Sequence, residues 1–289
     1  MSQKRIMIVG AAGQLGFDLC HAMKEYYEII AVDRGDCDVA DRDVVSAVIQ
    51  KARPDVVINL AAFHETEKCE REPERAFSVN ALGAYYVAIA ARAVGATVFF
   101  MSTDYAFDGS KDFFVETDTP RPLNIYGASK ISGEHLTRIG NPEGWRIIRT
   151  SWMFGAHMAG KLNFPQMMLT RALRGEVLRV VDDQVGSPTY ARDLAEKIKE
   201  LIERDAPCGV YHITNAGSCS WYAFAKKIFE LSGVIPKELI PIMTKESGTI
   251  IARPRVSVLK SARLQELGIA PLRHWHDALA AYLDEIKEK

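Results

Sequence analysis

The chain has no Cys-x-x-Cys pair, and its five cysteines lie scattered along 289 residues. An odd, dispersed set of thiols argues against a disulfide framework and indicates reduced cysteines. No apolar run approaches the roughly 18 residues that a membrane helix needs. The run Ile6–Val9 near the N-terminus is too short for a signal peptide and ends in a turn. We therefore expect a cytoplasmic protein with no membrane partner.

Net charge is nearly absent as well, because 36 basic and 37 acidic residues leave a formal charge of −1. So neutral a chain offers no bulk electrostatic case for binding nucleic acid or an anionic membrane. Internal repeats, low-complexity tracts and long linkers are also missing. The remaining composition, 48% hydrophobic and 25% charged, is that of one large or two closely packed globular domains.

Short apolar segments alternate with helical patterns through the first half of the chain. Strands are expected at 6–9, 28–32, 55–60, 97–101 and 146–150, with helices at 13–25, 44–51, 73–94 and 125–138. This alternation is typical of a parallel sheet with helices on both faces. We therefore predict an α/β fold with a doubly wound, Rossmann-type sheet.

The pattern changes after Trp152, where helices and strands become less regularly interleaved. We expect residues 1–150 to form a dinucleotide-binding domain, to which residues 176–205 return. Residues 151–175 and 206–289 are expected to form a smaller C-terminal α/β substrate domain that makes one wall of a cleft.

Three glycines, Gly10, Gly13 and Gly16, follow the first expected strand and open a helix. Such a turn lets the backbone approach a pyrophosphate, whose charge is stabilised by the helix N-terminus. A plain tight turn is the alternative, but the strand and helix that the motif requires are both in place. The turn therefore predicts a bound dinucleotide.

The residues after the second strand give opposite indications about that dinucleotide. Asp33 lies 20 residues after Gly13, where an acid normally accepts from the ribose hydroxyls of NAD. Arg34 beside it could pair with the 2′-phosphate of NADP, or could be a solvated surface arginine. Asp38 could contact the adenine or only cap the helix that begins near Asp41. Both NADPH and NADH remain candidate cofactors.

Small residues follow the third strand at Leu60, Ala61 and Ala62. They would allow a cofactor to approach the backbone closely, although close packing alone could also require them. His64 and Glu67 come next in the same loop, where they could touch substrate or be ordinary loop residues.

Tyr126 and Lys130 are four residues apart, and therefore on one face of the expected helix. A tyrosine titrates near pH 10, and a lysine beside it favours the phenolate, so the phenol could transfer a proton nearer neutral pH. Thr103 ends a parallel strand, where side chains face the ligand crevice, and could hydrogen-bond a substrate carbonyl. Capping of the next turn is the alternative for Thr103.

Metal ligands are not apparent in the sequence. Asp182 and Asp183 have no second cluster at ligand spacing, and His274 and His276 are not spaced as a helical metal pair. We predict no bound metal.

Several of these segments together resemble one family. They include Gly13–Gly16, Ser102–Gly109, Pro122–Gly127, Arg149–Trp152, Asp183–Thr189 and Ser220–Tyr222. In this order they are similar to the dTDP-4-dehydrorhamnose reductases, members of the extended short-chain dehydrogenase/reductase superfamily. The Ser-Thr-Asp-Tyr and Gln-Val-Gly-Ser-Pro-Thr pieces are more specific than the glycines.

The resemblance implies reduction, by NADPH or NADH, of the 4-keto group of a nucleotide-linked 6-deoxyhexose, giving dTDP-L-rhamnose. It implies that Thr103, Tyr126 and Lys130 are catalytic. It places the cofactor on Gly10, Gly13, Gln14, Leu15, Asp33, Arg34, Asp38, Leu60, Ala61, Ala62, Tyr126 and Lys130. It places the substrate on Thr103, Asp104, Tyr105, Phe107, Tyr126, Trp152 and Asn163.

Two other functions fit the same pattern. A sugar-nucleotide epimerase or dehydratase of this superfamily would keep its nicotinamide bound and recycle it. A non-catalytic regulatory subunit would keep the fold, but Thr103, Tyr126 and Lys130 would be free to change. The loop Phe63–Lys68 departs from the family's usual Thr and Val-Asp-Lys, which leaves the exact sugar open. Some family members form homodimers through a metal, and a homodimer is possible here; Asp18 could match one ligand.

Overall fold

The computed structural model describes residues 3–157, 160 and 162–287. Its centre is a six-stranded, all-parallel sheet in the order β10-β5-β4-β3-β1-β2. The strands are β1 (Arg5–Val9), β2 (Glu28–Val32), β3 (Val56–Asn59), β4 (Thr97–Thr103), β5 (Trp145–Thr150) and β10 (Gly209–His212). The predicted parallel, doubly wound sheet is confirmed.

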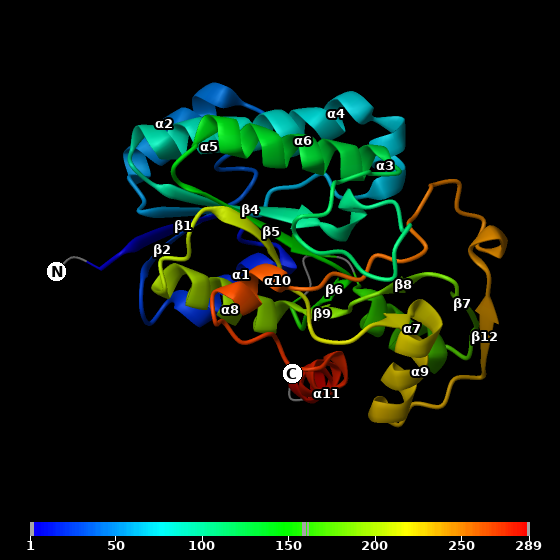
Figure 1. Ribbon diagram of the computed structural model, residues 1–289. Helices are drawn as coiled ribbons and strands as arrows, with labels where there is room; N and C mark the ends of the chain where they lie inside the picture. Colours follow the sequence, from blue (N-terminus) through cyan, green and yellow to red (C-terminus); the bar gives the residue numbers. More distant parts are fainter. Residues whose placement is uncertain (1–2, 158–159, 161, 288–289) are drawn as a thin grey trace.

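Helices cover both faces of this sheet (Figure 1). One layer holds α2 (Arg42–Ala52), α3 (Thr66–Arg71), α4 (Pro73–Phe77), α5 (Gly83–Ala93) and α6 (Ile125–Gly140). The other holds α1 (Gln14–Met23) and α8 (Ala191–Glu203). The expected helix over 73–94 is α4, a five-residue π-helix at Ser78–Leu82, and α5 in direct succession.

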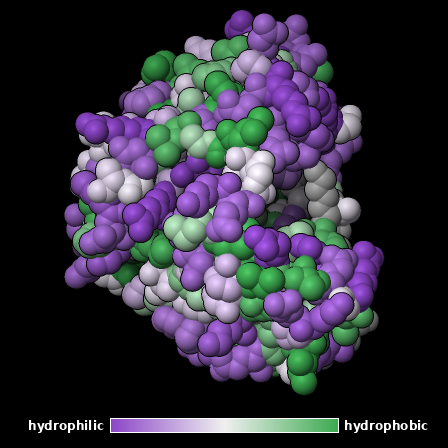
Figure 2. Space-filling view, turned by 90° about the vertical axis from the view of Figure 1, so that its right-hand side faces the viewer, coloured by the Kyte–Doolittle hydropathy of each residue, from purple (hydrophilic) through white to green (hydrophobic). Residues whose placement is uncertain are grey.

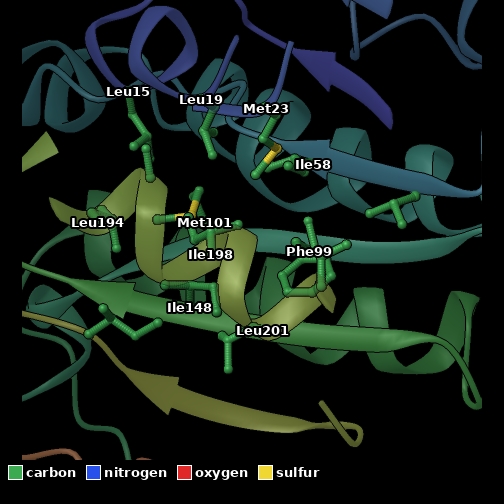
Figure 3. Packing of buried hydrophobic residues seen from close by; sticks show 14 of the residues in the cluster. Leu15, Leu19, Met23, Ile58, Phe99, Met101, Ile148, Leu194, Ile198 and Leu201 are labelled. Atoms are coloured by element: carbon green, nitrogen blue, oxygen red, sulfur yellow. The ribbon is translucent and has the colours of Figure 1, made fainter. Parts of the chain in front are cut away.

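Alternation along the central strands explains why both faces are covered. Ile6 and Ile8 belong to the core under α1 and α8, whereas Met7 and Val9 belong to the core under α2 and α5. Successive side chains of a strand point to opposite faces. A strand that is apolar at every position therefore needs a helix layer on each side. Figure 3 shows the first core, in which Ile198 of α8 lies among residues of the sheet.

A second, smaller unit packs beside the sheet. Its helices are α7 (Phe164–Leu173), α9 (Trp221–Ser232) and α11 (Trp275–Lys287). Its strands form three pairs: β6 (Met153–Phe154) with β9 (Thr189–Tyr190), β7 (Val177–Val181) with β12 (Glu238–Ile242), and β8 (Val185–Gly186) with β11 (Cys219–Ser220). An aromatic core that includes Phe154, Phe224 and Tyr282 joins them. Short helical segments lie at Asp104–Ala106 (η2), Thr244–Glu246 (η3) and Ala262–Glu266 (α10).

The boundaries between the two units differ from the expected ones in two places. Strand β7 does not return to the large sheet but pairs in parallel with β12 of the small unit. Strand β10 leaves the small unit and extends the large sheet beside β5, and Ile213, Leu264 and Ile269 enter the core below it. Helix α8 packs on α1 beside the large sheet. Within the described part of the chain, no helix is long and apolar enough to cross a membrane.

The core under α8 generates a stability prediction. Replacing Ile198, which is fully buried, with alanine should leave a cavity that the surrounding side chains fill only partly. We expect a loss of about 2–5 kcal/mol in the free energy of unfolding. Ile235→Ala is the matched control, since Ile235 is 90% exposed and should change stability by about 0.5 kcal/mol or less. Chemical denaturation of both variants measures the difference; equal losses would contradict this account of the core.

Candidate active site

A cleft of about 560 Å³ opens where β1, β3 and β4 end and the small unit begins. The face shown in Figure 2 is hollowed between its upper and lower parts. Most of the predicted site residues line this cleft. They are Gly10, Gly13, Gln14, Leu15, Leu60, Ala62, Thr103, Asp104, Tyr105, Tyr126, Lys130, Trp152 and Asn163. Ligands of open α/β sheets bind at this carboxyl edge of the strands.

The glycine turn brings the backbone to the edge of the cleft. Gly10 has φ +85°, a conformation that favours glycine, and its amide donates to Val32 O at 2.8 Å. Gly16 packs so tightly that a Cβ there would lie 2.5 Å from Ala11 O. Gly13 is the N-cap of α1 and offers no side chain to its first N–H groups. Those amides are therefore available to an anion such as a pyrophosphate.

The residues expected at the adenosine end lie outside this cleft. Asp33 accepts a hydrogen bond from Ala12 N at 2.8 Å, so one carboxylate oxygen is tied to the glycine turn. Arg34 is largely exposed and pairs with Asp38 at 3.3 Å. Ala61 is half-buried against the core beneath β2 and β3. Asp33 thus lies directly beside the glycine turn, with the Arg34–Asp38 pair at the surface next to it.

One buried amide joins the loop after β3 to helix α6. Asn80 accepts from Phe63 N at 2.8 Å, donates to Phe63 O at 3.0 Å, and donates to Ser129 Oγ at 2.9 Å. Asn80 lies in the π-helical segment, and its side chain is fully buried. This amide fixes the loop that brings His64 to the cleft.

Helix α6 delivers Tyr126 and Lys130. Asn124 caps it by accepting from Gly127 N at 2.9 Å. Gly127 lets the helix approach the end of β4, since a Cβ there would lie 2.3 Å from Tyr105 O. The Tyr105 and Tyr126 rings meet edge to face at 5.9 Å. The structure therefore brings Tyr126, Lys130 and Thr103 into one cleft, as the sequence predicts.

The electrostatics of the phenol differ from the expectation. Burial raises the pKa of Tyr126 above its ordinary value, the nearby carboxyl of Asp104 raises it further, and a hydrogen bond with Thr103 opposes the rise. Burial also lowers the pKa of Lys130 to about 7. The Lys130 ammonium lies 4.1 Å from the centre of the Phe100 ring. The predicted lowering of the phenol pKa is therefore not found, because desolvation outweighs the hydrogen bond with Thr103. A phenol that stays protonated suits a proton donor.

Asp104 is a second unusual acid in the cleft. Burial raises its pKa to about 6, although hydrogen bonds with Ser257 and Thr103 oppose the rise. Thr103 Oγ1 lies 3.2 Å from Asp104 Oδ1 and accepts from Tyr105 N at 3.2 Å. Thr103 therefore caps the following turn and also lines the cleft, so capping does not exclude a contact with substrate.

An aromatic pair forms the wall from the small unit. Trp152 stacks on Trp221 with ring centres 3.5 Å apart and planes 8° from parallel. Trp152 has φ +45°, an unusual conformation for a bulky residue. Gly186 makes room for the indole, since a Cβ there would lie 2.4 Å from it. The backbone at Trp152 is thus held where its ring faces the cleft.

Two predicted substrate residues have other tasks. The prediction for Phe107 does not hold, because its side chain is fully buried and stacks on Phe114 at 4.2 Å, away from the cleft. Asn163 lines the cleft, but its amide caps α7 and donates to Gly155 O at 2.6 Å. Its direct role toward a substrate stays a prediction.

Comparison with known proteins identifies the relationship. A family model described as the RmlD substrate binding domain matches residues 4–288. The chain belongs to the RmlD family. It is 42% identical over 283 residues to the spore coat polysaccharide biosynthesis protein SpsK of Bacillus subtilis, covering 97% of each. It is 37% identical over 281 residues to a dTDP-4-dehydrorhamnose reductase of Streptomyces griseus, covering 95% of this chain and 91% of that one.

A solved structure of the family is similar over nearly its full length. It is a dTDP-4-dehydrorhamnose reductase of Bacillus anthracis in complex with NADP, with a TM-score of 0.94 and 36% identity. The match covers 98% of this chain and all of that one. A UDP-glucose 4-epimerase of Thermotoga maritima has a TM-score of 0.84 at 21% identity, which shows a shared fold alone.

Several residues of the RmlD cleft were not predicted. Thr66 and Trp221 are the first residues of α3 and α9, and Met153 begins the short strand β6. No local pattern marks Thr66 or Met153 as a site residue. His64, for which the sequence leaves a substrate contact open, lines the cleft. Trp221 lies in one of the segments that carry the resemblance, which was the available signal. Among the described residues, no three His, Cys, Asp or Glu side chains gather as a metal site would require.

The glycine turn of this RmlD-family chain yields a binding prediction. Gly13→Val puts a branched side chain where a pyrophosphate would approach, beside Gly10 O. We expect the affinity for NADPH to fall by at least about a hundredfold, while far-UV circular dichroism and the unfolding midpoint stay close to wild type. Fluorescence titration measures the affinity. If the folded variant bound NADPH with wild-type affinity, the assignment of this turn to the cofactor site would be wrong.

Proposed function

We propose that this chain is an NADPH-dependent reductase that converts dTDP-4-dehydrorhamnose to dTDP-L-rhamnose. The observation that carries the proposal is the convergence of Thr103, Tyr126 and Lys130 beside the uncapped start of α1. The relatives named dTDP-4-dehydrorhamnose reductase support the substrate, and the NADP complex of one of them supports the cofactor. Because one fold can serve different substrates, the experiments below also test other ketosugars.

The cofactor half of the cleft suits a dinucleotide. Free amides at the start of α1 would hold the pyrophosphate, with Gly10 and Gly13 leaving room for it. Leu60 and Ala62 border the space beyond, and Gln14 and Leu15 form the first turn of α1. When bound, the nicotinamide supplies the hydride that reduces the substrate carbonyl.

The catalytic half of the cleft suits proton donation to that carbonyl. Thr103 would orient the substrate oxygen through its hydroxyl, and Tyr126 would give this oxygen a proton as negative charge develops. Lys130 would hold the nicotinamide ribose and stabilise the phenolate that Tyr126 becomes. The raised pKa of Tyr126 keeps the proton on the phenol until negative charge develops on the substrate oxygen.

The small unit would hold the nucleotide sugar. Trp152 and Trp221 offer a flat aromatic surface, and Asp104 and Tyr105 border the same space. We propose that the large sheet binds the dinucleotide and the small unit the sugar nucleotide. His64, in the loop that departs from the family's usual sequence, lies where it would influence the choice of sugar.

The proposed activity is tested by NADPH oxidation against a panel of nucleotide-linked 4-ketosugars. We expect one NADPH to be consumed for each dTDP-4-dehydrorhamnose reduced, with dTDP-L-rhamnose as product. Turnover without net NADPH consumption would favour an epimerase or dehydratase. Absence of turnover with every ketosugar, in a protein that binds NADPH, would favour a regulatory subunit.

A cytoplasmic location and a homodimer complete the proposal. The location is supported by cysteines that are all unpaired in the structure. The oligomeric state is tested by sedimentation of the purified protein.

Tyr126→Phe tests the proton donor. The variant lacks the hydroxyl but keeps the ring that packs on Tyr105, so the fold should be unchanged. We expect kcat to fall by about 10²–10⁴-fold with little change in NADPH affinity. Tyr86→Phe, on α5 and packed in the core, should leave kcat unchanged. A Tyr126 variant with near-normal kcat would show that another group donates the proton.

Arg34 and Asp33 test cofactor choice. Arg34→Ala should shift the ratio of kcat/KM values toward NADH by roughly fivefold, since an exposed ion pair is worth about 1 kcal/mol. Asp33→Asn should shift it toward NADPH, because it removes the charge but keeps an oxygen for Ala12 N. Wild type should use both cofactors within roughly two orders of magnitude. Arg92→Ala, on the exposed face of α5, is the charge-matched control; a wild-type preference beyond about a thousandfold would show that one residue dominates.

A further inference from the structure

A buried carboxylate lies one helical turn beyond Lys130. Glu134 is 2% exposed and receives three hydrogen bonds from two neighbouring strands. Arg149 of β5 donates from Nε to Oε1 at 2.8 Å and from Nη2 to Oε2 at 2.7 Å. Ser102, near the end of β4, donates to Oε1 at 2.5 Å. A fork of this kind holds a carboxylate in one geometry.

This carboxylate is placed to act on Lys130. The two residues are i and i+4 on α6, so their side chains lie on the same face. The charge of Glu134 raises the pKa of Lys130, opposing the burial that lowers it. Among the described residues, the direct ion pair of Glu134 goes to Arg149 and not to Lys130. The N–H groups of Lys130 can therefore donate hydrogen bonds to a ligand. The negative charge of Glu134 still acts on the ammonium.

The other charged groups around α6 act elsewhere. Asp104, at the end of β4, raises the pKa of Tyr126, as does the neighbouring phenol of Tyr105. His212 of β10 lies 3.4 Å from Arg149 Nη1, and burial together with that guanidinium lowers the histidine pKa to about 3. His212 is therefore neutral near pH 7. This buried set thus contains the cations Lys130 and Arg149 and the carboxylate of Glu134.

We infer that Glu134 is a positioning residue for the reaction, whose buried carboxylate keeps the Lys130 ammonium charged at the floor of the cleft. The inference rests on the role proposed for Lys130. A buried lysine without an anion nearby tends to lose its proton. A neutral amine would hold the nicotinamide ribose less well and would not stabilise the phenolate of Tyr126. The ion pair with Arg149 holds this carboxylate in a fixed position.

The test is the pH dependence of NADH binding, measured by fluorescence. NADH is used because it lacks the 2′-phosphate, since phosphate monoesters titrate near pH 6. In the wild type, affinity should weaken as pH rises through the pKa of Lys130, because the charged form is lost. Glu134→Gln removes the anion, so the pKa of Lys130 should fall. The weakening should then begin at a pH lower by about one unit or more.

Glu134→Asp is the conservative control, because it restores the charge on a shorter side chain. It should bring the pH of half-maximal affinity back to within a few tenths of the wild-type value, even if both variants are less stable. A purely structural role for Glu134 would change the unfolding midpoint of both variants and leave this pH unchanged. An unchanged pH in Glu134→Gln, or equal shifts in the two variants, overturns the inference. So does a wild-type affinity that does not vary with pH.

Glu134→Gln leaves Arg149 buried without its partner, and this can prevent folding. The double variant Glu134→Gln/Arg149→Met removes both charges and should fold. It should also show the lower pH of half-maximal affinity; a wild-type value there overturns the inference. None of these titrations contains a ketosugar substrate, so their outcome is separate from the reductase assay. Failure to reduce any ketosugar would refute the proposed function while the binding data decide on Glu134.

Discussion

The close contact of α6 with the end of β4 is the constraint on which the site depends. Gly127 lies against Tyr105 O, and Gly133 lies against Asn80 O, where a Cβ would be 2.2 Å from the carbonyl. Because glycine has no side chain, α6 can lie directly against the neighbouring backbone at both positions. Tyr126 and Lys130 then reach Thr103 in the same cleft. A larger residue at either glycine would push the helix, and with it the phenol and the ammonium, away from the strand end.

Burial then determines the chemistry of those side chains. The same close packing that positions Tyr126 and Lys130 also removes water from them, and desolvation is the largest influence on the pKa of each. It disfavours the phenolate and the ammonium alike. As a result, Tyr126 keeps its proton, and the pKa of Lys130 falls to about 7. Glu134, held by Ser102 and Arg149, opposes the loss of charge on the lysine.

The two packing units share the cleft unequally. The large sheet contributes the glycine turn, the loop after β3, the end of β4 and the start of α6. The small unit contributes Trp221, with Trp152 stacked on it. Chain segments pass between the units several times, since β10 joins the large sheet after β7 has joined the small one. This interlacing resists separation of the two walls, because neither unit is a continuous stretch of chain.

Local patterns in the sequence determined the strands β1 to β5 and the helices α1, α2 and α6, because each depends on residues only a few positions apart. For the same reason they determined the glycine turn and the Tyr126–Lys130 pair. They also determined that Thr103 ends a strand at the ligand edge of a parallel sheet. Only the tertiary structure decided the partners of β7 and β10, the burial of Phe107 and the stacking of Trp152 on Trp221. It also decided the sign of the pKa shift at Tyr126 and joined Glu134 to Ser102 and Arg149. These features arise from contacts between residues far apart in the chain and from the exclusion of water, neither of which a local pattern records.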